Sequence, residues 1–89
     1  MNLEPHHITV VVYVDGQKFD VAAEGAESAE SLLRRVVEHH HLNRPPEDYK
    51  LCWYASGQPL DLAESLRENK VVEGSVLALV PEAGIGGGA

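Results

Sequence analysis

The sequence lacks several features that define whole classes of protein. A single cysteine, Cys52, excludes an internal disulfide and any zinc site built from several cysteines. No apolar run approaches the ~18 residues that a membrane-spanning helix needs. Residues 1–5 have neither the basic start nor the apolar run of a signal peptide, so we expect a cytoplasmic protein.

Basic side chains are also scarce. The 89 residues include 7 Lys and Arg against 14 Asp and Glu, which gives a formal net charge of −7. Apart from Arg34 and Arg35 the cations are scattered singly, so nucleic acid and anionic membranes are not expected as partners. The length fits one small domain, the 44% hydrophobic content fits a globular chain, and we expect a monomer.

The first half of the chain predicts a hairpin followed by a helix. Residues 8–14 are β-branched or aromatic, and residues 17–23 alternate between apolar and polar. The intervening Asp15 and Gly16 supply the positive φ angles of a tight turn. Apolar residues then recur at helical spacing over 28–41, with Ser28 as a good N-cap, and Pro45 and Pro46 prevent the helix from continuing.

The second half predicts further strands at 50–54, 59–62 and 75–80. A capping box formed by Ser65 and Glu68 indicates a short helical turn between the last two. In the final strand, alternation places Val76, Ala78 and Val80 on one face.

The order of these elements resembles the β-grasp fold of ubiquitin-like proteins. Residues 45–51 (PPEDYKL) are similar to ubiquitin's Pro-Pro-Asp loop and third strand, and 57–80 align with ubiquitin without a gap. The resemblance implies an α+β fold with a mixed sheet of four to five strands and one long helix across it. It implies a flexible N-terminus at 1–7, a domain at 8–80 and a flexible glycine-rich tail at 81–89.

The tail, PEAGIGGGA, follows the last predicted strand as it does in ubiquitin-like modifiers. Extended, residues 80–88 reach about 27 Å at ~3.4 Å per residue, and glycines allow close backbone approach in a narrow channel. The resemblance implies that Gly86, Gly87 and Gly88 form the conjugation site. An ATP-dependent activating enzyme would adenylate the carboxylate, and a conjugating enzyme would pass it to target proteins. The chain itself would be no enzyme and would need no cofactor.

Several residues depart from ubiquitin. Ala89 follows the glycines, so the resemblance implies a peptidase that removes it and exposes Gly88, with Gly87 as the other candidate terminus. Glu82 stands where ubiquitin's tail is basic, and Glu82 with Ile85 would therefore be read by a cognate set of enzymes. The pattern is similar to bacterial ubiquitin-like proteins encoded beside activating, conjugating and metallopeptidase genes.

Two surfaces follow from the same resemblance. Ubiquitin's apolar docking patch falls on Cys52, Ala78 and Val80. The candidate acceptor lysines for chain formation are Lys18, Lys50 and Lys70.

Two other functions share these features. A sulfur carrier would form a thiocarboxylate at the same tail, and a non-covalent β-grasp binding module would not need the tail. The triplet His39, His40 and His41 predicts no metal site, because consecutive helical residues point about 100° apart.

Overall fold

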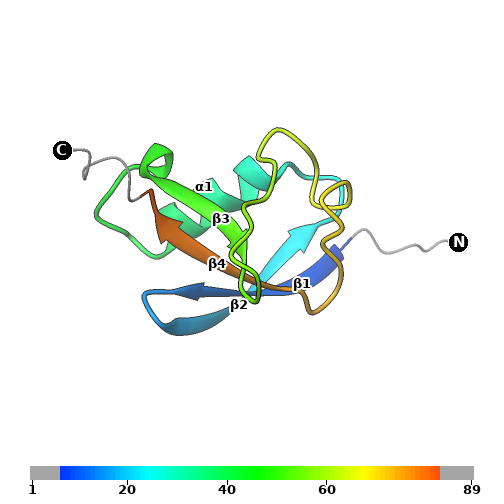
Figure 1. The fold of residues 1–89 in the computed structure, drawn as a ribbon, viewed down its shortest axis with the longest axis horizontal. Coiled ribbons are helices and arrows are strands. Elements are labelled where there is room, and N and C mark those ends of the chain that lie inside the picture. Colours follow the sequence, from blue (N-terminus) through cyan, green and yellow to red (C-terminus); the bar gives the residue numbers. More distant parts are fainter. Residues whose placement is uncertain (1–6, 83–89) are drawn as a thin grey trace, which may run out of the picture.

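The computed structural model describes residues 7–82. Strands β1 (His7–Val14) and β2 (Gln17–Glu24) are followed by helix α1 (Ala29–His39), the 3-10 turn η1 (Pro46–Asp48), and strands β3 (Tyr49–Trp53) and β4 (Val76–Pro81). The strands form one sheet in the order β2-β1-β4-β3, and α1 lies across one face (Figure 1). The predicted mixed sheet with a single helix is therefore confirmed.

The pairing of β1 organises the sheet. It is antiparallel to β2 through the turn at Asp15 and Gly16, whose φ angles of 53° and 80° are those of a tight hairpin. It is parallel to β4, which is in turn antiparallel to β3. The four strands lie within one residue of their predicted bounds.

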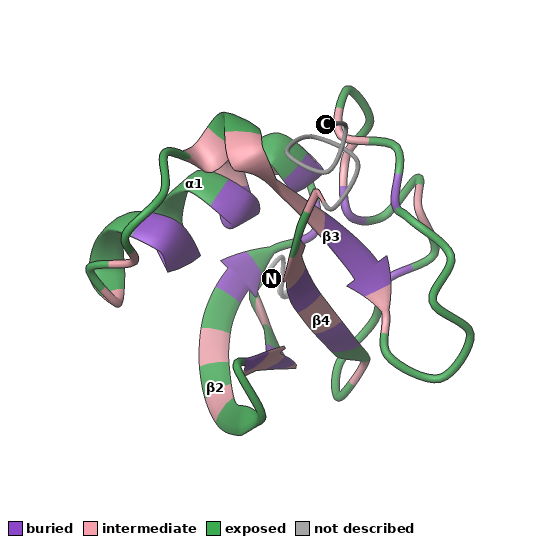
Figure 2. Cartoon of the chain, turned by 60° about the vertical axis from the view of Figure 1, so that its left-hand side comes forward, coloured by how far each residue is buried: buried purple, intermediate pink, exposed green. Residues whose placement is uncertain are grey.

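The core lies between the sheet and α1. Fully or almost fully buried apolar side chains from every layer meet there, namely Val10, Val12, Leu32, Leu33, Val36, Leu51, Leu66 and Leu77. Figure 2 shows the same arrangement, with buried positions on the side of α1 that faces the sheet. The alternation of β1 and the helical spacing of α1 therefore point their apolar faces at each other.

Helix α1 is shorter than predicted at both ends. Ser28 is the N-cap, as expected, and its Oγ accepts a hydrogen bond of 3.0 Å from the Ser31 N–H. The helix ends at His39 because His40 leaves the helical conformation and His41 has a left-handed φ of 51°. The predicted range of 28–41 therefore includes the N-cap and two residues beyond the helix.

The prediction of a strand at 59–62 is wrong. The structure has only an isolated bridge between Cys52 and Pro59. Pro59 has no N–H to donate to a ladder, so the contact is made by its neighbours. Trp53 N–H donates to the Gln58 carbonyl at 2.9 Å, and Leu60 N–H donates to the Leu51 carbonyl at 2.8 Å.

Residues 54–75 contain no strand or helix, yet they are fixed to the domain. Leu60, Leu66 and Val71 are buried in the core. The predicted capping box is confirmed, since Ser65 N–H donates to Glu68 Oε1 and Glu68 N–H donates to Ser65 Oγ, both at 3.0 Å. The segment thus crosses the end of the sheet as a folded part of the domain.

Candidate functional site

The face of the sheet opposite α1 carries Tyr54 and Val76, two of the three large apolar side chains that are exposed among residues 7–82. Its residues are set by the pairing, which aligns Val11 with Val76, Tyr13 with Ala78, and Cys52 with Ala78. Each of these alternates with a buried core residue. We call this the outer face and define it by Val11, Tyr13, Cys52, Tyr54, Val76, Ala78 and Val80.

Two tyrosines dominate the outer face. Tyr13 of β1 and Tyr54, directly after β3, stack with ring centroids 4.3 Å apart and an angle of 22° between their planes. Tyr54 is 54% exposed and the neighbouring Val76 is 38% exposed. The stacked rings and the small side chains beside them give an apolar patch that a partner could cover, with Lys18 and Asp20 of β2 next to it on the same side of the sheet.

The three residues of the predicted docking patch lie on this face but differ in exposure. Ala78 and Val80 are half-buried, whereas Cys52 is only 3% exposed. Burial raises the pKa of the Cys52 thiol; Lys50 lowers it by a smaller amount, and Glu82 adds a further increase. Cys52 therefore contributes little area to a partner, and its thiol is kept protonated.

The exit of the tail is fixed to the domain. Pro81 pairs with Tyr49, and the Glu82 N–H donates to the Asp48 carbonyl at 2.8 Å. Glu82 is half-buried at this point. The domain therefore holds the chain up to the residue at which the predicted recognition segment begins.

The remaining tail predictions lie outside the described residues. These are Ile85, Gly86, Gly87, Gly88 and the removal of Ala89.

The three lysines occupy different environments. Lys18 is exposed on β2, and Lys50 is half-buried on β3 opposite Val80. Lys70 is exposed in the segment before β4, with a left-handed φ of 71°. Their amines are not brought together by the fold, and each remains a separate candidate acceptor.

Sequence reasoning missed the two tyrosines and Val11 as surface residues. The signal was present, because side chains alternate along a strand: Val11 and Tyr13 stand between core residues of β1, and Tyr54 is two residues after Cys52. Within residues 7–82, no group of three or more His, Cys, Asp or Glu side chains is arranged to hold a metal ion. In the same range no helix has the length and apolar character to cross a membrane.

Comparison with solved structures identifies the class of fold as ubiquitin-like. A protein designed de novo on the basis of ubiquitin superimposes with a TM-score of 0.75 at 20% identity, over 90% of this chain and 94% of that one. Ubiquitin of Caldiarchaeum subterraneum gives 0.72 at 18% identity, over 84% and 92%. A protein of Arabidopsis thaliana gives 0.71 at 23% identity, over 89% and 90%.

By fold, then, the chain is a ubiquitin-like module. Its residues 3–87 match the model of a family described as proteins of unknown function, DUF2604, and the chain belongs to that family. No curated protein matches it.

Proposed function

We propose that this chain is a ubiquitin-like protein modifier that is joined to target proteins through the carboxylate of Gly88. One observation carries the proposal: the last strand of a ubiquitin-like domain leads, through the anchored Glu82, directly into a segment whose sequence is AGIGGGA. A segment of mostly glycine and alanine that begins at an anchored residue is suited to presenting a carboxylate at a distance from the domain.

The chemistry lies with partner enzymes. A peptidase removes Ala89, and an activating enzyme then joins the Gly88 carboxylate to the α-phosphate of ATP, releasing pyrophosphate. A cysteine thiol of that enzyme displaces AMP and forms a thioester. After transfer to the thiol of a conjugating enzyme, a target amine displaces the thiol and forms an amide. The chain itself acts as the substrate and supplies no catalytic group.

The two described parts of the site have distinct roles in this proposal. Glu82 lies at the point where an enzyme channel would begin, so a cognate activating enzyme should offer it a basic group. The outer face would dock the conjugating enzyme through Tyr54 and Val76. Glu82→Arg should then reduce thioester formation, whereas Tyr54→Ala should spare it and reduce the later transfer.

The test uses the chain ending at Gly88 with ATP and each activating enzyme encoded near its gene. We expect an adduct on gels that dithiothreitol removes. The matched control is the chain that retains Ala89, which should form no adduct until a peptidase has acted. Absence of an adduct with every such enzyme would overturn the proposal.

Two outcomes would assign a different function. A mass gain of about 16 Da on the Gly88 form, from exchange of oxygen for sulfur at the acyl group, would indicate a sulfur carrier. Full function after deletion of residues 85–89 would indicate a non-covalent binding module. The tyrosine pair, in which Tyr54 is exposed and Tyr13 is half-buried, favours this last alternative over the sulfur carrier, because it offers a binding surface that does not involve the tail.

A further inference from the structure

Strand β2 forms one edge of the sheet, and its backbone shows which groups face away from β1. The Ala22 carbonyl accepts a hydrogen bond from Arg35 Nη2 at 3.1 Å, and the Glu24 N–H donates to Glu27 Oε1 at 3.0 Å. These groups therefore point out of the sheet. Because backbone direction alternates along a strand, the N–H and C=O groups of Lys18 and Asp20 also face the free edge.

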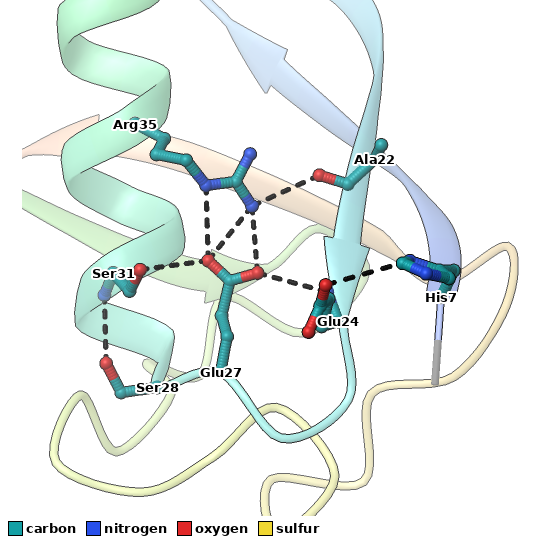
Figure 3. Close-up of polar contacts among 7 residues, drawn as sticks. All are labelled: His7, Ala22, Glu24, Glu27, Ser28, Ser31 and Arg35. Carbon is teal, nitrogen blue, oxygen red and sulfur yellow. Dashed lines mark hydrogen bonds and ion pairs between the residues drawn. The ribbon is translucent and has the colours of Figure 1, made fainter. Parts of the chain in front are cut away.

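The Glu27–Arg35 ion pair closes the half of this edge that lies next to α1. Arg35 Nη2 is 2.8 Å from Glu27 Oε1 and 2.9 Å from Oε2, and Arg35 Nε is 3.2 Å from Oε2. Figure 3 shows the pair reaching from the helix to the end of β2, with Ser31 also donating to Glu27. Its bonds occupy edge groups of Ala22 and Glu24, so another strand cannot pair there without displacing them.

The half of β2 next to the hairpin turn is open. Figure 2 shows this half curving away from α1. Lys18 and Asp20 are exposed, and their side chains share the outer side of the sheet, since they pair with Tyr13 and Val11. Phe19, between them, points to the helix side, where its ring centroid lies 4.0 Å from that of His40.

The open half of β2 is self-complementary, so the same half of a second copy can pair with it. If a second copy pairs antiparallel with the two-fold axis at Phe19, Lys18 of each copy lies opposite Asp20 of the other. Each such pair can exchange both N–H···O bonds, and opposite charges directly across strands attract. The two Phe19 side chains meet on the axis as a non-hydrogen-bonded pair, whose side chains approach closely.

The ion pair also disfavours the next equivalent register toward the end of β2. Moving the axis to Val21 would place Asp20 opposite Ala22, whose carbonyl is already bound by Arg35. The axis at Phe19 uses only backbone groups that face the open half.

We propose that two copies of this chain associate through antiparallel pairing of β2 with β2, centred on Phe19. From the sequence alone we expected a monomer; the self-complementary edge is the reason to propose a dimer. The contact is small, so the dimer is weak and depends on concentration. It does not involve the tail, and deleting residues 85–89 should leave it unchanged.

The test exchanges the two charges. Asp20→Lys places lysines opposite lysines, and Lys18→Asp places aspartates opposite aspartates, so each variant alone should dimerise at least about tenfold more weakly. A mixture of the two variants restores opposite charges at both pairs and should form a heterodimer. The double variant K18D/D20K should recover the homodimer. Glu64→Lys, at an exposed acid away from the edge, is the control for net charge.

Sedimentation velocity from about 0.01 to 1 mM gives the mass, and 15N-edited NMR over the same range should show shifts concentrated at residues 17–21. Because both charged side chains are exposed, the variants should keep the wild-type circular dichroism and melting temperature, which separates lost pairing from lost folding. A monomer mass throughout would overturn the proposal. So would a dimer that is insensitive to Asp20→Lys but lost in Tyr54→Ala, which would place the contact on the outer face. Failure of the two variants to form a heterodimer would exclude this register and so overturn the proposal.

Discussion

Leu66 should be the main anchor of the long segment between β3 and β4. It is fully buried, and its backbone joins two parts of the domain. The Leu66 N–H donates to the Glu27 carbonyl at 2.9 Å, and its carbonyl accepts from Val71 N–H at 2.9 Å. Replacing Leu66 with alanine keeps these backbone groups and removes only the side chain from the core.

The cost follows from burial. Removing a fully buried leucine side chain loses its transfer free energy and leaves a cavity, which together cost about 2–5 kcal/mol. We expect about 3 kcal/mol for Leu66→Ala, because Leu66 is completely buried within the core cluster. For a domain of this size that corresponds to a fall in melting temperature of about 12–24 °C.

The assay is urea unfolding followed by the fluorescence of Trp53, the single tryptophan, which packs against the core from β3. Val72→Ala is the matched control in the same segment, since Val72 is 61% exposed and its loss should change stability by at most about 0.5 kcal/mol. A cost below about 1 kcal/mol for Leu66→Ala would refute the reasoning, because it would mean that the segment can leave the core without unfolding the sheet.

Three further predictions concern local features. Glu68→Ala removes the acceptor of the Ser65 N–H and should destabilise the domain by about 1 kcal/mol in urea unfolding, whereas an unchanged midpoint would deny the capping box any energetic role. Burial, with His39 and His41 as smaller causes, lowers the pKa of His40 from its ordinary 6.5, so the unfolded chain takes up this proton first and the wild type loses stability as the pH falls below 6.5. Between pH 6.5 and lower pH, the melting temperature should fall less steeply in His40→Gln than in the wild type. Equal dependence of the two melting temperatures on pH would contradict this. Cys52 should react with a disulfide reagent at least about tenfold more slowly in the native protein than in urea, and comparable rates would show that its thiol is accessible.

Local patterns were enough to predict most of the fold. The two-residue alternation of β1, the Asp15–Gly16 turn and the helical spacing of α1 each depend on neighbours in sequence, and each is confirmed. The predicted strand at 59–62 is reduced to an isolated bridge, because Pro59 has no N–H to donate to a ladder. The two residues lost from the end of α1 reflect the left-handed His41, which the sequence of three histidines does not reveal.

The site was less accessible to sequence reasoning because it depends on pairing between distant strands. Ala78 and Val80 could be assigned to one face from β4 alone. The Tyr13–Tyr54 stack forms only because β4 lies between β1 and β3. This strand order cannot be predicted from a local sequence pattern. The Glu27–Arg35 pair likewise depends on the angle at which the chain enters α1.

The bridge at Pro59 has a consequence for assembly. A sheet with two open edges can add strands on both sides, and repeated addition produces fibres. Here β3, at the other edge from β2, has groups of Leu51 and Trp53 already bonded to the returning chain at Leu60 and Gln58. If two copies pair through β2, no further copy can therefore add at β3. Residues 58–60, which cover the edge of β3, would limit the assembly to a dimer.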